Sequence, residues 1–271
     1  MSKKSKSVVV VSDIHCGSST AVCTQHPYNS ELDSEYKPNK LQRALNSAWY
    51  DCIDDLTQKP TLLVVNGEPC DGGNPKQNGQ QSWTTNVNDQ LNDASELLGD
   101  IPNENLMFIR GSKYHVQVEG TNFEEIIASK MGAKPYKAYG GSGLTDYYAL
   151  VEINGKHFNF THHVGFNKWA AYRTTALARE MAGLVFDRDK IGRADVVVRS
   201  HVHYFVHIEF VHTHGVCTPA WKFPDAHLFR SGVAGTTPDI GMVEFIIEPN
   251  GKIEVVKHIA ELDIKPMVKH Y

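Results

Sequence analysis

Carboxylates and histidines follow short apolar runs at five points along the chain. Asp13 and His15 follow the valines at 8–11. Four later runs end in the same kind of polar group: Glu68 with Asp71, Ser112 with His115, His162 with His163, and His201 with His203. A set of Asp, Glu and His side chains without thiolates is typical of sites for one or two divalent first-row ions, such as Mn, Fe, Ni or Zn. Two ions about 3.5–4 Å apart need a bridging carboxylate, for which Asp13 and Glu68 are best placed.

The first half of the chain alternates apolar runs with amphipathic segments. Three short runs predict strands buried on both faces, as in a parallel sheet: 8–11, 61–65 and 106–109. Apolar residues at helical spacing predict three helices: 39–56, 87–98 and 122–131. Side chains alternate along a strand, so Asp13 and His15 are expected on the same side where the first strand ends. Ligands often bind at that carboxyl edge of a sheet.

The second half is expected to be rich in β-structure. Its predicted strands lie at 147–153 and 157–161, which form a hairpin, then at 195–199 and near 205–218 and 241–258. One more helix is predicted over 168–185. Between the first strand and the first helix, residues 18–38 have no sustained period, which predicts a long loop of the kind that often serves a site.

Composition and charge favour a single globular domain over residues 1–271, with 1–6 as a flexible basic tail. The 271 residues are 41% hydrophobic and 21% charged, which is ordinary for a globular chain. The net charge of −4 provides no global positive field that would draw the protein to nucleic acid or to an anionic membrane. We therefore expect no membrane partner. The sequence leaves the oligomeric state open.

Five cysteines, an odd number with no CxxC pair, fit a reducing compartment and predict free thiols. The apolar run behind the basic start MSKKSKS is too short for a signal-peptide core or a membrane span. We expect a cytoplasmic protein.

Taken in order, the five polar groups resemble the motifs of the calcineurin-like metallophosphoesterases. Those motifs are D-x-H, G-D-x-x-D, G-N-H, a strand ending in His, and G-H-x-H. Here they stand as Asp13-Ile14-His15, Gly67-Glu68-Pro69-Cys70-Asp71, Gly111-Ser112-Lys113-Tyr114-His115, Thr161-His162-His163 and Ser200-His201-Val202-His203. The motifs extend over residues 13–203, most of the chain. The resemblance implies an α/β fold, the metallophosphoesterase-type sandwich of two mixed β-sheets flanked by helices.

The resemblance also implies a role for each residue of the motifs. Asp13, His15 and His203 would hold one ion, Glu68 would bridge, and His162 with His201 would hold the second. His115 would be catalytic, because it would stabilise charge in the transition state or protonate the leaving oxygen. Positions next to the ligands or facing substrate would be taken by four further residues: Asp71, Ser112, His163 and Arg110.

Three departures from the family pattern bear on these roles. Glu68 replaces the bridging Asp, so its extra methylene must be absorbed by the backbone or by the bridging mode. Ser112 replaces the Asn ligand and His115 comes two residues late, which predicts a weaker second metal site. Ser200 replaces a glycine, a mild change if the backbone there keeps a negative φ.

The resemblance implies a divalent-metal-dependent hydrolase of phosphate esters, a phosphodiesterase or phosphatase. We expect a small, nucleotide-like substrate, because the loops 16–38 and 72–86 leave the ligand edge with only Lys37 and Lys76 as basic residues. Two alternatives stay open. One is a DNA or RNA nuclease of the same fold, with charge supplied by the arginines between 173 and 193. The other is a non-catalytic metal-binding interaction module.

Other residues receive structural interpretations. Trp49 and Trp169 lie in helical patterns and are expected in the core. Three histidines after the last ligand pair are expected on a solvated strand face: His207, His212 and His214. Cys16 adjoins the site but is not expected to be a ligand.

Overall fold

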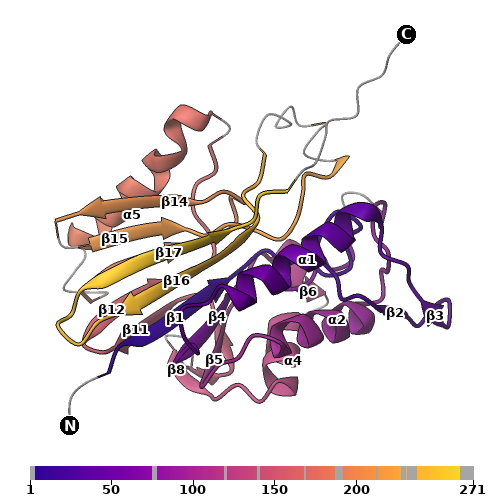
Figure 1. The fold of residues 1–271 in the computed structure, drawn as a ribbon, viewed down its shortest axis with the longest axis horizontal. Coiled ribbons are helices and arrows are strands. Elements are labelled where there is room, and N and C mark those ends of the chain that lie inside the picture. The colour runs from indigo at the N-terminus through magenta and orange to yellow at the C-terminus, as the bar shows by residue number, and fades with distance from the viewer. Residues whose placement is uncertain are drawn as a thin grey trace.

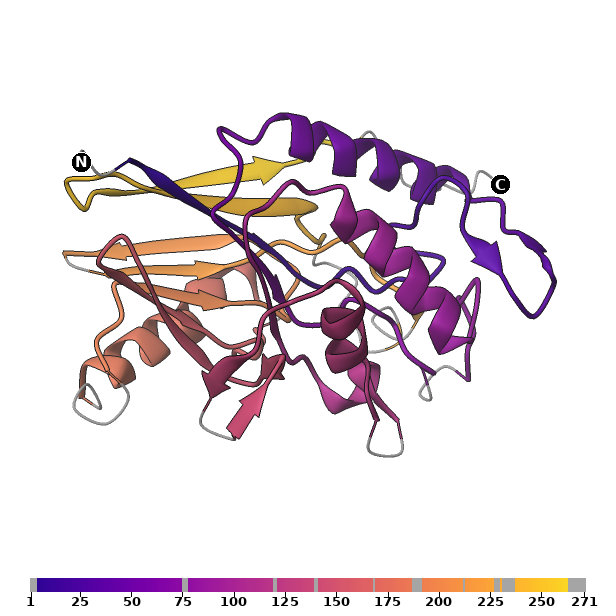
Figure 2. The same cartoon turned by 90° about the horizontal axis from the view of Figure 1, so that it is seen from below.

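Two β-sheets pack face to face, with helices on their outer surfaces (Figures 1 and 2). The computed structural model describes residues 4–74, 78–118, 121–138, 141–167, 169–186, 192–211, 213–226, 230 and 237–262. Both sheets mix parallel and antiparallel neighbours. The predicted α/β class and the sandwich of two mixed sheets are therefore confirmed.

The first sheet has six strands in the order β10-β5-β4-β1-β16-β17. Their bounds are β1 (Lys6–Val11), β4 (Leu62–Asn66), β5 (Leu106–Ile109), β10 (Thr145–Asp146), β16 (Gly241–Ile247) and β17 (Ile253–Ile259). The strands β1, β4 and β5 run parallel, as their uniformly apolar sequences predicted. The short strand β10, which was not predicted, adds parallel to β5, and β16 adds antiparallel to β1. Lys6 pairs with Ile247, so the sheet begins inside the predicted tail.

The second sheet has five strands in the order β11-β12-β13-β15-β14. Their bounds are β11 (Ala149–Ile153), β12 (Lys156–Phe160), β13 (Val196–Arg199), β14 (Val206–Phe210) and β15 (Thr213–Cys217). The predicted hairpin is present as β11–β12, and its second strand continues in parallel to β13 and β15. Short two-stranded ladders complete the β-structure: β2 (Tyr28–Asn29) with β3 (Ser34–Glu35), β6 (Gln117–Val118) with β7 (Thr121–Asn122), and β8 (Tyr136–Ala138) with β9 (Gly141–Gly143).

Three helices cover the outer face of the first sheet, and one covers the second. The first three are α1 (Lys40–Asp54), α2 (Val87–Gly99) and α4 (Phe123–Lys130), all close to the predicted ranges. Asn39 caps α1 by accepting from the backbone N–H of Gln42, whose side chain accepts in return from Asn39, which explains why the helix begins there. On the second sheet lies α5 (Arg173–Phe186), preceded by the short helix η1 (Ala170–Tyr172).

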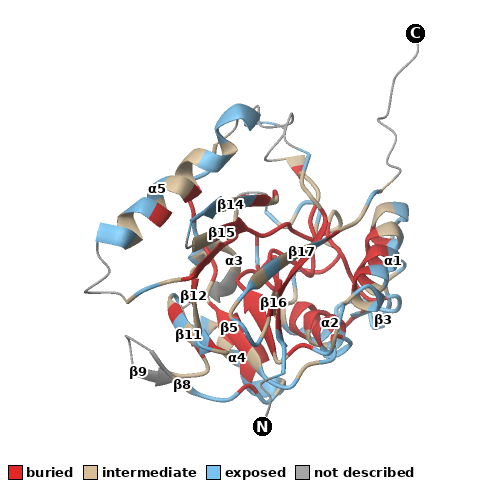
Figure 3. Cartoon of the chain, turned by 60° about the vertical axis from the view of Figure 1, so that its left-hand side comes forward, coloured by how far each residue is buried: buried red, intermediate tan, exposed pale blue. Residues whose placement is uncertain are grey.

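Apolar side chains fill three layers. Alternate residues of β1 face opposite ways, so that Val9 and Val11 meet the helices while Val8 and Val10 meet the second sheet. Leu177 and Met181 are the buried residues of α5, and the rest of that helix is intermediate or exposed (Figure 3). Among the described residues, no helix has both the length and the apolar character needed to cross a bilayer.

Of the two tryptophans expected in the core, one is placed correctly. Trp49 is fully buried and packs edge-on against Trp221, with ring centroids 4.7 Å apart. The prediction for Trp169 is wrong, because it precedes η1 and is 64% exposed. The helix α5 begins only at Arg173, so the range 168–185 predicted from helical spacing started too early and wrongly included Trp169. All five cysteines are buried free thiols, as predicted.

Candidate metal centre

The ends of β1, β4, β12 and β13 bring the predicted ligands together. Two groups of four residues each have ligand atoms that lie within 4.8 Å of one another. One group is Asp13, His15, Glu68 and His203, and the other is Asp13, Glu68, His162 and His201. The two groups share Asp13 and Glu68, the two carboxylates that the sequence singled out as bridges.

The backbone that presents these side chains is left-handed rather than extended. Five of the predicted ligands have positive φ: Asp13 51°, His15 52°, Glu68 58°, His201 72° and His203 57°. The strands β1 and β4 end at Val11 and Asn66, before the ligands. Asp13 and His15 do face one centre, but the reason given by strand alternation is wrong. Non-glycine residues in this region cost about 1–3 kcal/mol each and cluster at functional sites.

Backbone hydrogen bonds hold the first two ligand loops against each other. The N–H of Asp13 donates to the carbonyl of Gly67 at 3.1 Å, and that of His15 donates to Glu68 at 3.0 Å. A Cβ at Gly67 would collide with the ring of His162, which explains why glycine precedes Glu68. In the loop that carries His201 and His203, Ser200 does not have a positive φ, so no glycine is required at that position.

The histidine rings are oriented by partners on their outer sides. Nδ1 of His15 lies 3.1 Å from Oδ1 of Asp71, and Nδ1 of His162 lies 2.6 Å from the carbonyl oxygen of Asn66. The other ring nitrogen of each, Nε2, is buried and faces Glu68, at 3.0 Å from Oε2 for His15 and at 3.3 Å from Oε1 for His162, without the geometry of a hydrogen bond. Oδ1 of Asp13 lies 3.2 Å from Nε2 of His203, and Nδ1 of His201 lies 3.9 Å from Oε1 of Glu68, again without hydrogen-bond geometry.

Those four atoms all face the shared centre, where their neighbours are carboxylates and imidazoles of the same two groups. Buried polar atoms are rarely left without a hydrogen bond, and a bound ion would supply the missing partner. Metal-ligating histidines commonly bind the ion through one nitrogen and donate the other to a carboxylate or carbonyl, which is the arrangement of His15 and His162. The donor set and its geometry therefore fit divalent cations.

Charge in the centre also favours a cation. Burial opposes ionisation of Asp13 and Glu68, but the histidines around them, His162 foremost, hold the pKa of both carboxyls below the usual range. Burial alone would lower the pKa of His162, yet Glu68 and Asp13 raise it to about 9. Burial lowers the pKa of His201 to about 4. The two buried carboxylates thus attract positive charge to the place between them.

Ser112 contacts the carboxylate of Glu68 directly. Its hydroxyl donates to Oε1 of Glu68, and its backbone N–H donates to the same oxygen at 3.2 Å. At the neighbouring Gly111, a Cβ would lie 2.6 Å from Cγ of Glu68. The side chain of Glu68 therefore packs against the bare backbone at Gly111, and Ser112 fixes its carboxylate.

His115 reaches the centre in spite of its late position in the motif. It lies on the one-turn helix α3 (Lys113–Val116), which absorbs the two extra residues. Its ring centroid is 4.6 Å from that of His15, and its Nδ1 is 2.8 Å from the carbonyl oxygen of Asp71. Burial lowers the pKa of His115 to about 4.

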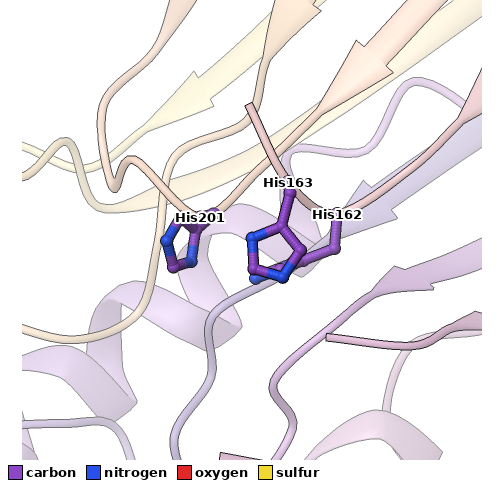
Figure 4. A group of neighbouring side chains, drawn as sticks. All are labelled: His162, His163 and His201. Atoms are coloured by element: carbon purple, nitrogen blue, oxygen red, sulfur yellow. The ribbon is translucent and has the colours of Figure 1, made fainter. Parts of the chain in front are cut away.

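The structure separates the two remaining predicted residues. His163 is exposed and lies beside the second ligand group, with its ring centroid 4.6 Å from that of His201 (Figure 4). Arg110 instead donates from Nε to Thr145 at 2.7 Å and from its terminal nitrogen to Glu125 at 3.4 Å. The side chain of Arg110 therefore contacts residues of β10 and α4 and not the predicted metal ligands.

Two charged residues at the centre were not predicted. Nζ of Lys222 is buried and lies 2.8 Å from Oδ1 of Asp71, the carboxylate that orients His15. Glu124 is also buried, and its Oε1 accepts from the N–H groups of Gly111 and Glu68 at 2.8 and 3.2 Å. Burial raises the pKa of Glu124 to about 8. No motif marks either residue, and only the charge of Lys222 within an apolar stretch, PAWKF, sets it apart.

No family model and no curated protein matches this chain. Among solved structures, vacuolar protein sorting 29 from Cryptosporidium parvum matches with a TM-score of 0.46 and 13% identity, covering 96% of this chain and 100% of that chain. Vps29 from Entamoeba histolytica complexed with Zn²⁺ gives 0.42 and 12%, covering 93% and 99%. An archaeal phosphodiesterase gives 0.41 and 12%, also covering 93% and 99%. Likeness at this level carries no argument about activity, and the α/β class rests on the strand order of this chain.

Proposed function

We propose that this chain is a divalent-metal-dependent phosphoesterase of the calcineurin-like type. The observation that carries the proposal is the pair of four-residue groups that share Asp13 and Glu68. Asp13, His15 and His203 would hold one ion, His162 and His201 the other, and Glu68 would bridge them. The donors suit Mn, Fe, Ni or Zn. Bound ions would lower the pKa of a water, orient phosphoryl oxygens and neutralise charge in the transition state.

The chain's own residues have three tasks in this proposal. Asp71 and the carbonyl of Asn66 fix the rings of His15 and His162, so each presents Nε2 to the centre. Ser112 fixes the orientation of Glu68. His115 lies beside His15 with its Nδ1 engaged by Asp71, which leaves Nε2 as the atom available to stabilise charge or protonate a leaving oxygen.

We propose a small phosphate ester, nucleotide-like in size, as substrate. The two loops expected to cover the ligand edge do pair with each other: the N–H of Trp83 donates to Gly17 at 2.8 Å and that of Ser19 to Gln81 at 2.6 Å. Lys76 lies outside the described residues. The described part of these loops carries Glu31, Asp33 and Glu35 on its exposed surface, which disfavours a polyanion.

The direct test is hydrolysis of bis(p-nitrophenyl) phosphate with Mn²⁺, Ni²⁺ or Zn²⁺. The wild-type protein should turn over this diester, and the His203→Ala variant should lose both turnover and bound metal. His26→Ala is the matched control, because His26 is an exposed histidine that pairs with Glu35 in the β2–β3 ladder region. Metal bound in two equivalents without hydrolysis of diester or monoester substrates would defeat the enzyme proposal and favour a metal-binding interaction module.

A further inference from the structure

The hairpin formed by β14 and β15 carries a second group of metal-binding side chains. His207 and Glu209 are two residues apart on β14, so they share a face, and Glu209 lies directly opposite His214 on β15. Val206 and Ile208, which alternate with them, pack into the apolar layer under α5. The three polar side chains therefore project from the face opposite α5, with His207 and Glu209 exposed and His214 partly buried. His212 lies outside the described residues.

The geometry of the two imidazoles suits chelation. Nε2 of His207 lies 3.1 Å from Nδ1 of His214, and the rings are stacked with an interplanar angle of 21°. An ion about 2.0–2.1 Å from each nitrogen would then subtend an N–metal–N angle of about 100°, within the range of tetrahedral and octahedral coordination. A carboxylate oxygen of Glu209 completes the group, because the three ligand atoms all lie within 4.8 Å of one another.

The contact between the two imidazoles points to the place of an ion. It accommodates one hydrogen between Nε2 of His207 and Nδ1 of His214, and a bound ion would take the place of that hydrogen.

This group lies at the other end of the second sheet from the candidate metal centre. His214 pairs with Val196 at the start of β13, whereas the ligand loop with His201 follows Arg199 at the end of that strand. The group on β14 and β15 is thus separate from the candidate metal centre, and no side chain belongs to both.

We propose that His207, Glu209 and His214 form a separate metal site for a borderline divalent ion, Zn²⁺, Ni²⁺ or Cu²⁺. Two imidazoles and one carboxylate are suited to these ions, and solvent would fill the open positions. β14 is the edge strand of the sheet, so a bound ion would link that edge to β15 through side chains in addition to the backbone ladder. This proposal does not depend on the phosphoesterase function.

The test counts ions on the full-length protein. Wild type, His207→Ala and His214→Ala are dialysed against saturating Zn²⁺, and bound zinc per chain is measured by elemental analysis. We expect one zinc fewer in both variants, with hydrolysis of bis(p-nitrophenyl) phosphate unchanged. His26→Ala is the control, since His26 has a glutamate 2.8 Å away but belongs to no three-ligand group among the described residues.

Two further measurements keep the result interpretable. Cu²⁺ bound to the wild type should show hyperfine coupling to two nitrogens in its electron paramagnetic resonance spectrum, and this component should vanish in His214→Ala. Glu209→Gln, an exposed change that keeps the side-chain shape, should weaken zinc binding while the circular dichroism spectrum stays unchanged. Equal zinc content in wild type, His207→Ala and His214→Ala would overturn the proposal, as would the same Cu²⁺ spectrum in wild type and His214→Ala.

Discussion

Replacing Lys222 with methionine tests whether the buried ion pair beside the metal centre holds the site together. Nζ of Lys222 lies 2.8 Å from Oδ1 of Asp71 and 3.3 Å from Asp225. Lys222→Met leaves Asp71 buried with His15, His115 and Asn74 as its remaining side-chain neighbours. Removing one member of a buried pair typically costs about 3–5 kcal/mol, because the other charge stays buried and uncompensated.

The loss of folding stability in Lys222→Met should be smaller at low pH than at high pH. Burial and the charge of Lys222 both lower the pKa of His15, although its carboxylate neighbours raise it overall. Without Lys222, the pKa of His15 rises further in the folded state. A raised histidine pKa contributes stability below the unfolded pKa of about 6.5 and loses it as pH rises through the folded value. The variant should therefore be closer to wild type at pH 6 than at pH 9.

Urea unfolding followed by tryptophan fluorescence measures this difference, since Trp221 is buried next to Lys222. Lys252→Met is the control, because Lys252 is 66% exposed, lies 3.6 Å from Glu248 and should change stability by less than about 1 kcal/mol. The double variant Asp71→Asn/Lys222→Met should recover part of the loss, because position 71 no longer buries a carboxylate that has lost its lysine. Equal midpoints for Lys222→Met and Lys252→Met would refute the reasoning.

Three further outcomes are expected. Asp13→Asn should lose turnover and the ions of the candidate centre, whereas His115→Ala should bind as many ions as wild type by elemental analysis and lose about 10²–10⁴-fold in kcat. Unchanged kcat in His115→Ala would remove that residue from the mechanism. Burial raises the pKa of Asp93 in the folded protein to about 6, above the unfolded value near 3.8. The contribution of this group to folding stability is therefore fully present below pH 3.8. It amounts to roughly 3 kcal/mol and is lost as pH rises through 6. Asp93→Asn, which keeps an acceptor for Thr24, should therefore flatten the dependence of urea midpoints on pH between 4 and 8, and an unchanged slope would contradict this. Oligonucleotide binding should be weak and depend little on salt concentration. For duplex DNA, log K falls with log[salt] with a slope of about −0.9 for each phosphate that the protein neutralises, and we expect few such contacts. Efficient, salt-sensitive cleavage of oligonucleotides would favour a nuclease instead.

The sequence predicted the elements because its apolar periods are strong and local. The runs at 8–11 and 61–65 became adjacent parallel strands, and the capped segment from Asn39 became α1. Strand order brought the polar ends together, so the residues that converge could be named from their positions alone. The prediction for Trp169 was wrong because helical spacing of apolar residues does not show at which residue the helix begins.

Other features of the centre depend on contacts between distant segments. Lys222 reaches Asp71 across 151 residues, and no local pattern predicts such a pair. Glu124 lies in the first turn of α4, where acidic residues are common, yet it is buried against the N–H groups of Gly111 and Glu68. The left-handed backbone of Asp13, His15 and Glu68 accompanies hydrogen bonds between their two loops, from Asp13 to Gly67 and from His15 to Glu68, which join segments far apart in the sequence.

That left-handed backbone makes the ligand positions unusual targets for protein engineering. Glycine adopts positive φ without the steric cost that other residues carry, so His203→Gly or His201→Gly relieves local strain while removing a ligand. These loops would therefore yield variants that withstand more denaturant and bind less metal. A laboratory selection for thermal resistance alone would drift toward glycine at these positions, whereas a selection for ion binding would hold the strained residues in place. The two pressures act in opposite directions on the same few residues.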